Sequence, residues 1–355
     1  MIRLRRLLII GICIFVLIVA CDREAYLQDN RYSDPSTNNT SIPASSESCR
    51  MVKHEMGETE VCGQPQKVAA LSPHILDSML ALGVQPAGYA AWVEYKDLKT
   101  QTYDNPAEQI PYLGKRVTTK PIVLGDRNSP SLERLALLKP DLILGEYFGN
   151  EDEYSFLTQI APTLLFSDKN ADGQQFWQND IQAIAQALGK ETQAEELLAA
   201  WEQQIAQART ALKPLLQGDP RIFIISTDLT TYINSQPEST PARLLKEIGF
   251  KIVKPEGTQG EAEISFETLS KIDADIIIVM SRSDENFYNP EPALRRKWEE
   301  NPLLNSMSVF QQDRVFFVDI YLWSSVFRGP LADKLILEAL PDLLLGNVEK
   351  AKETR

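Results

Sequence analysis

Several arginine and aromatic side chains follow segments of this sequence that we expect to form buried strands. Tyr147 follows the apolar run that ends at Leu144, and Arg282 follows the run that ends at Met280. Trp92 lies after an earlier strand in the same way. Ligands of parallel α/β folds gather at the carboxyl ends of the strands. Because a guanidinium binds oxyanions and an aromatic ring covers apolar surface, these residue types favour an anionic, partly apolar ligand.

Further candidates of the same two types lie in loops. Arg127 lies in Gly-Asp-Arg-Asn-Ser-Pro, just before Ser131, and Arg116 lies in the same long loop. Trp323 and Arg328 lie together in Tyr-Leu-Trp-Ser-Ser-Val-Phe-Arg. We expect these four residues to join the ligand site. The structural alternative is a surface ion pair for an arginine and a place over the core for a tryptophan.

Catalysis and direct metal binding find little support in the sequence. There is no Gly-x-Ser-x-Gly elbow, no phosphate loop and no Ser/His pairing. Zinc and manganese sites need several His and carboxylate ligands in a cluster, whereas the chain has only His54 and His74. We therefore predict no enzyme, no metal ligands and no cofactor. His74 and a tyrosine of the other lobe leave haem open as an alternative ligand.

The N-terminus predicts export and a lipid anchor. Residues 1–6 contain three arginines, and residues 7–20 form an uncharged apolar run. That run is shorter than the roughly 20 residues that span a bilayer, so residues 1–20 are typical of a secretory signal. The four residues that end at Cys21 resemble a bacterial lipobox, in which the cysteine is acylated and begins the mature chain. An ordinary signal, or an uncleaved anchor, is the alternative.

The segment at residues 21–47 is rich in Ser, Asn, Thr, Asp and Pro, and we expect it to be a flexible tether. The formal net charge of -13 argues against a nucleic-acid partner and against general adhesion to anionic lipid. A few arginines can still set the sign of a small pocket.

Two cysteines remain after the signal and the lipidation site are set aside, namely Cys49 and Cys62. An even pair in an oxidising compartment predicts a disulfide, with two free thiols as the alternative. The alternation of residues 50–61 predicts a small hairpin that turns at residues 56–58.

An internal repeat indicates the architecture. Residues 131–144 (SLERLALLKPDLIL) align with residues 265–278 (SFETLSKIDADIII). In each copy a serine caps a short helix, a glutamate lies in its first turn, and an aspartate precedes a buried strand. The simplest explanation is two similar α/β lobes with central parallel sheets.

Between the two copies lies a long stretch of apolar residues at helical spacing, interrupted only by Gly189. It predicts one long helix, or two collinear helices, that links the lobes beside a ligand cleft. We expect an N-terminal lobe at 48–175, the linking helix at 176–217, a C-terminal lobe at 218–346 and a tail at 347–355. Strands are expected at 68–71, 142–144 and 276–280, and a helix at 75–82.

Seven short motifs together resemble one protein family. They are residues 52–59 (VKHEMGET), 65–71 (PQKVAAL), 80–88 (LALGVQPAG), 125–133 (GDRNSPSLE), 138–145 (LKPDLILG), 160–162 (IAP) and 323–330 (WSSVFRGP). In this order they resemble the iron–siderophore branch of the substrate-binding proteins of ATP-driven importers, in the class whose lobes are joined by a helix. The resemblance covers roughly residues 49–345.

This resemblance implies a rigid two-lobed clamp that binds a ferric siderophore at the lobe interface. It implies that Glu133 and Glu267 meet arginines of the importer's permease, which works with an ATPase. In the hydroxamate-binding relatives, an arginine in the loop equivalent to that of Arg127 contacts the chelate. Relatives often place an aromatic contact near Trp323, and many have glycine in place of Arg328.

The expected protein is therefore a monomeric binding protein held by lipid on the outer side of the cytoplasmic membrane, facing the periplasm or the exterior. Haem and cobalamin stay open as other cargo. The siderophore class, whether hydroxamate, citrate or catecholate, stays open as well.

Overall fold

The computed structural model describes residues 48–92, 101–167, 177–229, 232–258, 260–281, 291–324 and 327–353. The predicted signal peptide and tether lie outside these ranges, as do Cys21 and Arg282. Within them, no helix combines the length and the apolar character needed to cross a membrane.

The described chain begins with an antiparallel hairpin of β1 (Cys49–His54) and β2 (Gly57–Cys62). Cys49 and Cys62 lie directly opposite each other and form a disulfide. The turn was predicted one residue too late, because His54 pairs with Gly57 and leaves only Glu55 and Met56 to make it. Arg50 donates from Nη2 to the carbonyl of Ala187 at 2.7 Å, which holds the hairpin against the first lobe.

The first lobe contains a six-stranded sheet in which all neighbours are parallel except the edge pair β6–β5. In spatial order its strands are β6 (Ser129–Pro130), β5 (Ile122–Asp126), β4 (Gly88–Ala91), β3 (Val68–Ala70), β7 (Leu142–Glu146) and β8 (Thr163–Phe166).

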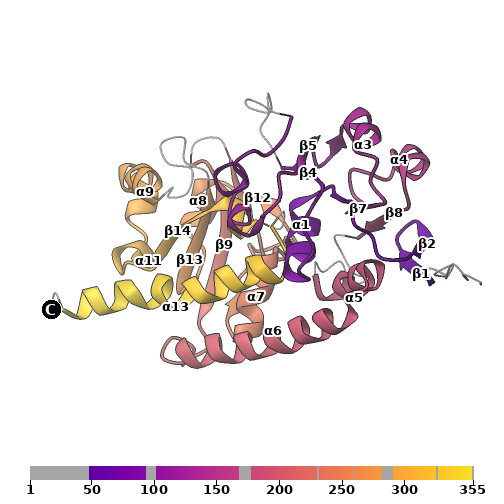
Figure 1. The fold of residues 1–355 in the computed structure, drawn as a ribbon. Coiled ribbons are helices and arrows are strands. Elements are labelled where there is room, and N and C mark those ends of the chain that lie inside the picture. Colours follow the sequence, from indigo (N-terminus) through magenta and orange to yellow (C-terminus); the bar gives the residue numbers. More distant parts are fainter. Residues whose placement is uncertain are drawn as a thin grey trace, which may run out of the picture. The chain divides into compact units, whose positions relative to one another are not determined.

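The second lobe also has six strands, with a parallel centre of β9, β13 and β14 (Figure 1). Its strands in spatial order are β12 (Ala262–Glu263), β10 (Ile233–Ser235), β9 (Arg221–Thr227), β13 (Ile276–Ser281) and β14 (Val315–Asp319), while β11 (Lys251–Ile252) pairs with β9. Two lobes with central parallel sheets confirm the predicted fold class.

Helices cover both faces of each sheet. Those of the first lobe are α1 (Pro73–Ala81), α2 (Pro106–Gln109), η1 (Gly114–Arg116), α3 (Leu132–Leu138), α4 (Tyr154–Ile160) and α5 (Trp177–Leu188). The rest are α6 (Glu191–Ala211), α7 (Thr240–Ile248), α8 (Phe266–Ser270), α9 (Glu291–Glu300), α10 (Pro302–Asn305), α11 (Ser308–Gln311), α12 (Ile320–Trp323) and α13 (Pro330–Glu353).

Alternate residues of the central strands face opposite layers, as the period of a strand requires. In β13, Ile276, Ile278 and Met280 pack into the core shared with α6, α7 and α13. Ile277 and Val279 pack on the other face, into the core shared with α8 and α9. Because both faces are covered by helices, the central strands are continuous apolar runs.

The two copies of the internal repeat make equivalent hydrogen bonds. Ser131 caps α3 by accepting from the amide of Arg134, and Ser265 caps α8 by accepting from the amide of Thr268, as predicted. The aspartates of the two copies also have equivalent roles, which the sequence did not indicate. Each carboxylate accepts a hydrogen bond from a backbone amide at the start of the neighbouring strand. The Asp141 carboxylate accepts from the Lys67 amide at 2.9 Å, and that of Asp275 accepts from the Arg221 amide at 2.8 Å.

The helical stretch between the repeats consists of two helices, α5 and α6, divided at Gly189. The apolar face of α5 belongs to the core of the first lobe. Helix α6 touches that core through Ala194 and the core of the second lobe through Ile205 and Ala208. It packs beside α13, as Figure 1 shows. Side chains of α6 therefore contact both cores, as do those of α13, through Ala332 in the first and Ile336 in the second.

Helix α13 begins against a buried carboxylate of the first lobe. Asp77 of α1 accepts from the amides of Leu331 and Ala332 at 2.9 and 2.8 Å. These amides belong to the first turn of α13, which has no partners for them within the helix. A side chain at Gly329 would collide with Asp77, so glycine is required there for this close approach. Burial raises the pKa of Asp77 to about 7, although the two amides oppose that shift.

We predict that Asp77 makes the protein less stable as the pH rises from about 4 to about 7. Its pKa in the fold, about 7, exceeds its ordinary value of 3.8, so in this window the folded chain holds a proton that the unfolded chain releases. The free energy of unfolding then falls by up to about 1.4 kcal/mol per pH unit. Asp77→Asn should remove this component, because an amide does not titrate in this range, while its oxygen keeps one of the two hydrogen bonds from α13.

The measurement is urea unfolding of both chains at four pH values between 4.5 and 7.5. Other titrating groups are common to the two chains and cancel in the difference of their unfolding free energies. A difference that stays constant over this range would contradict the prediction.

Candidate functional site

The carboxyl ends of three parallel strands of the first lobe, β5, β4 and β7, meet at Arg127. This residue follows β5, and its amide donates to the carbonyl of Ala91, the last residue of β4, at 2.9 Å. Its Nη1 donates at 2.9 Å to Oε2 of Glu146, the last residue of β7. The Arg127 side chain is 15% exposed. Arg127 therefore lies at the edge of the sheet where ligands of such folds bind.

The carboxylate of Glu146 lies between two guanidinium groups. Nη2 of Arg328 is 2.5 Å from Oε1 of Glu146, and both side chains are almost fully buried. Burial acts to raise the pKa of Glu146, but Arg328 and Arg127 outweigh it and hold that pKa below its ordinary value. Two cations and one anion leave this cluster with a net charge of +1. The Nε–H of Arg127 is buried and has no hydrogen-bond acceptor within the described ranges. The cluster is thus suited to an anion that supplies acceptor oxygens.

His74 holds the segment of Arg328 in place. Its Nδ1 donates to the carbonyl of Arg328 at 2.6 Å, and its Nε2 is 3.2 Å from Oδ2 of Asp180. The ring is fully buried. Because both nitrogens are engaged with oxygens, His74 cannot serve as an axial haem ligand in this fold. The alternative of His74 as a haem ligand is therefore not supported.

Aromatic contacts join the first lobe to the segment after β14. The Trp92 ring packs on Tyr321, with ring centroids 5.2 Å apart. The hydroxyl of Tyr112 donates to the carboxylate of Asp319, and its ring meets Phe327 edge-on at 6.2 Å. Trp92 is half-buried and lies near the carboxyl ends of β4 and β14. Among the predicted aromatic candidates, Trp92 is therefore held by a tilted ring contact with Tyr321, which follows the last strand of the second lobe.

The other predicted site residues lie in different surroundings. Trp323 is 4% exposed and packs in the core of the second lobe. Tyr147 is 40% exposed at the end of β7. Arg116 is exposed in η1, and its charge acts on Asp77. Among the predicted site residues, Arg328 shares the ion-pair partner Glu146 with Arg127.

The predicted docking residues Glu133 and Glu267 occupy equivalent, exposed positions in the first turns of α3 and α8. Glu133 also lines a pocket of about 350 Å³ together with Gln101, Thr102, Ile122, Arg134 and Leu137. The matching positions follow directly from the matching serine caps of the two repeats.

Glu146, Asn150 and Phe148 were not recognised in the sequence. The sequence feature that could have identified Glu146 is its position as the one charged residue at the end of an apolar buried strand, directly before Tyr147. Such a residue needs a partner inside the protein, which here is an arginine from 182 positions further along the chain. No local pattern identifies that partner.

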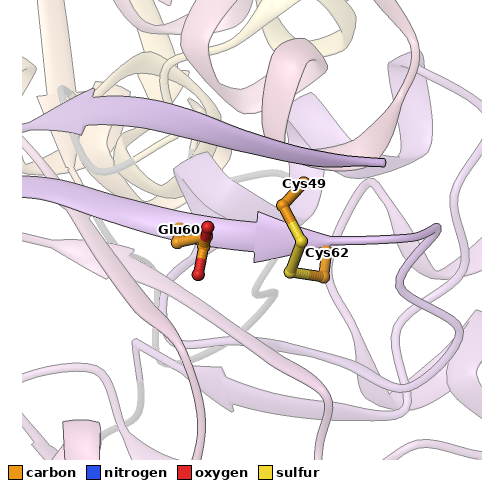
Figure 2. A group of neighbouring side chains, drawn as sticks. All are labelled: Cys49, Glu60 and Cys62. Atoms are coloured by element: carbon orange, nitrogen blue, oxygen red, sulfur yellow. A yellow bond between two sulfur atoms is a disulfide. The ribbon is translucent and has the colours of Figure 1, made fainter. Parts of the chain in front are cut away.

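In the described part of the chain, one group of side chains has the spacing of a metal site, namely Cys49, Glu60 and Cys62. Figure 2 shows the two sulfur atoms bonded to each other, with Glu60 beside them on β2. Cysteine binds a metal ion as the thiolate, and neither sulfur is a thiolate in a disulfide. The oxidised hairpin therefore does not provide a metal site.

Comparisons with known proteins agree with this architecture. The family described as periplasmic binding protein matches residues 68–321. The chain is 27% identical over 317 residues to an Fe(3+)-citrate-binding protein of Bacillus subtilis, which covers 88% of this chain and 90% of the relative.

Among solved structures, SirA of Staphylococcus aureus complexed with staphyloferrin B superposes with a TM-score of 0.65. It is 23% identical, and the match covers 84% of this chain and 98% of that one. The triscatecholate siderophore binding protein FeuA of Bacillus subtilis, complexed with ferri-bacillibactin, gives a TM-score of 0.64 at 22% identity, with 84% and 99% covered. At these identities, the likeness shows the fold.

We predict that Glu146→Gln destabilises the protein by about 3–5 kcal/mol, because it leaves the buried guanidinium of Arg328 without its counter-charge. Arg328→Met should cost a similar amount. The double variant should cost clearly less than the sum, because the two charges are removed together. Urea unfolding of the four chains measures this cycle.

The exposed pair of Lys251 and Asp219, 2.7 Å apart, is the control. Lys251→Met and Asp219→Asn should each change stability by less than about 1 kcal/mol. Additive effects at Glu146 and Arg328 would show that the two do not form an ion pair.

Proposed function

This chain belongs to the periplasmic binding protein family, and on that premise we propose that it binds a ferric siderophore outside the cytoplasmic membrane and delivers it to the permease of an ATP-driven importer. The observation that carries the proposal is the cationic cluster of Arg127, Glu146 and Arg328 at the carboxyl ends of the strands of the first lobe. No catalytic role is proposed.

The chemistry of a ferric siderophore matches this cluster. The ligand surrounds its iron with hydroxamate, catecholate or carboxylate oxygens, so its surface carries acceptor groups and excess negative charge. The protein then needs no metal ligand of its own, and the iron is cargo. Arg127 is the side chain of the cluster that solvent reaches, and its planar fork suits such oxygens. Arg328 is buried and does not meet the ligand; it holds Glu146 in place, and Glu146 in turn orients Arg127.

The named cargo of the relatives supports the same class. The Fe(3+)-citrate-binding relative shares nearly its whole length with this chain. The two structural neighbours were solved with staphyloferrin B and with ferri-bacillibactin. Haem finds no support, because His74 is engaged through both ring nitrogens. No observation favours cobalamin.

The proposed protein partner is the permease, which we expect to contact one exposed glutamate on each lobe. We assign docking on the transmembrane permease subunits, which work with an ATPase, to Glu133 and Glu267. Both carboxylates are exposed and lie on equivalent helices, one on each lobe. A permease that offers two cationic groups could engage both lobes at once. Arg116, Tyr147 and Trp92 remain proposed ligand contacts, as does Arg282, whereas Trp323 lies too deep to be one in this fold.

For the anchor, we propose acylation of Cys21 and a tether over residues 22–47, so that the monomeric binding unit faces the periplasm or the exterior. Acyl chains contribute roughly 0.8 kcal/mol per buried methylene to membrane attachment. The basic and apolar residues before Cys21, and the polar composition after it, support this arrangement.

Binding is tested by titrating the full chain, in detergent, with ferric citrate, a ferric hydroxamate and a ferric tris-catecholate, following tryptophan fluorescence. We predict that one of them binds tightly and that Arg127→Ala weakens it at least tenfold, which is about 1.4 kcal/mol. Arg127→Lys should recover only part of the loss, because it keeps the charge without the fork.

Lys115→Ala is the control, since Lys115 is an exposed cation near Arg116 and should leave affinity within twofold. Tight binding that Arg127→Ala leaves unchanged would exclude Arg127 from the site. Binding of haem or cobalamin, with no response to any ferric chelate, would refute the siderophore assignment.

The anchor is tested by fractionating cells that express the chain. We predict that Cys21→Ser moves the protein from the membrane pellet to the soluble exported fraction, because no acyl group can be attached. Cys13→Ser, within the predicted signal, should leave it in the pellet. An unchanged distribution of the Cys21 variant would argue for an uncleaved apolar anchor.

A further inference from the structure

The loop that follows β7 is held rigidly beside Arg127. Nδ2 of Asn150 donates to the carbonyls of Arg127 and Glu146, at 3.3 and 3.1 Å. The amide of Tyr147 donates to the carbonyl of Phe166 at 2.8 Å, which continues the pairing with β8. Asn150 is almost fully buried. The loop is therefore tied to two of the three residues of the cationic cluster, Arg127 and Glu146.

Gly149 makes this arrangement possible. Its φ of +87° lies in the region that side chains other than glycine rarely adopt. A Cβ atom there would lie 3.2 Å from the Cα atom of Asn128, in the loop that carries Arg127. The turn after β7 and the turn after β5 thus pack directly on each other, so the direction in which Tyr147 and Phe148 leave the sheet is fixed.

This fixed turn holds two consecutive aromatic side chains in solvent. Tyr147 is 40% exposed and Phe148 is 59% exposed. Burial of apolar surface stabilises a protein by about 25 cal/mol per Å², so an exposed phenylalanine ring contributes little to the stability of the fold. Adjacent aromatic side chains beside a cationic cluster are suited to a ligand that carries rings and negative charge together.

Resting on the proposed function, we propose that Phe148 is a ligand contact and selects ferric chelates whose donor groups are borne on aromatic rings, that is, catecholates or phenolates. In a catecholate the anionic oxygens are attached to the ring itself. One such group can therefore meet the guanidinium of Arg127 with its oxygens while its ring packs on Phe148. The carboxylates of citrate lie on an aliphatic chain, which satisfies Arg127 and leaves the phenylalanine without a stacking partner.

The test compares two chelates on the full mature chain in detergent: the tris-catecholate ferric bacillibactin and ferric dicitrate. Phe148→Ala should weaken ferric bacillibactin about tenfold and ferric dicitrate less than twofold. Phe148→Leu keeps apolar bulk without the ring and should still lose several-fold on the catecholate. Phe156→Ala is the matched control, because Phe156 is 55% exposed but lies on α4, and it should change neither affinity by more than twofold.

Equal losses on both chelates, or no loss on either, would overturn the selective contact. Wild-type binding of ferric dicitrate without binding of ferric bacillibactin would overturn it too, while the siderophore function stands. Failure of the wild-type chain to bind any ferric chelate would instead refute the proposed function itself. The expected selective loss supports both.

Discussion

The candidate site depends on one buried carboxylate, that of Glu146, and on the two guanidinium groups that neutralise it. A charge in the interior is costly unless it is paired and hydrogen-bonded, and here the pairing partners come from distant parts of the chain. Forming the pair therefore requires the end of β5, the end of β7 and the segment before α13 to meet at one point. The same requirement fixes Arg127 in the orientation that a ligand would encounter.

Other polar contacts, made by residues 319–324 and 327–333, also attach the end of β14 and the start of α13 to the first lobe. Tyr112 bonds to Asp319, His74 bonds to the carbonyl of Arg328, and Asp77 accepts the first amides of α13. All of these link the first lobe to the last residue of β14 or to residues that follow it. Separating them would leave buried donors and acceptors without partners, at about 1–3 kcal/mol each. The contacts therefore favour a fixed position of these residues relative to the first lobe.

The sequence predicted what local patterns encode. The serine caps, the buried strands and the repeat follow from periodicity and capping, and all are present. Arg127 was predicted as a site residue, but its partner Glu146 was not, because an ion pair between distant segments leaves no local signal. Trp323 was expected at the ligand and lies in the core, since the pattern around it cannot tell which face of a four-residue helix is covered.

A chain with a net charge of -13 can still attract an anionic chelate, because charge acts over short distances in salt. At physiological ionic strength the Debye length is about 8 Å, so carboxylates spread over the surface are largely screened at the site. Two guanidiniums and one carboxylate, packed where water is scarce, are screened much less. The sign of the site is therefore set by the trio, and Glu146 limits its charge to +1. A ligand at the proposed site would gain part of its affinity from that charge, and the remainder would come from groups such as the aromatic rings after β7.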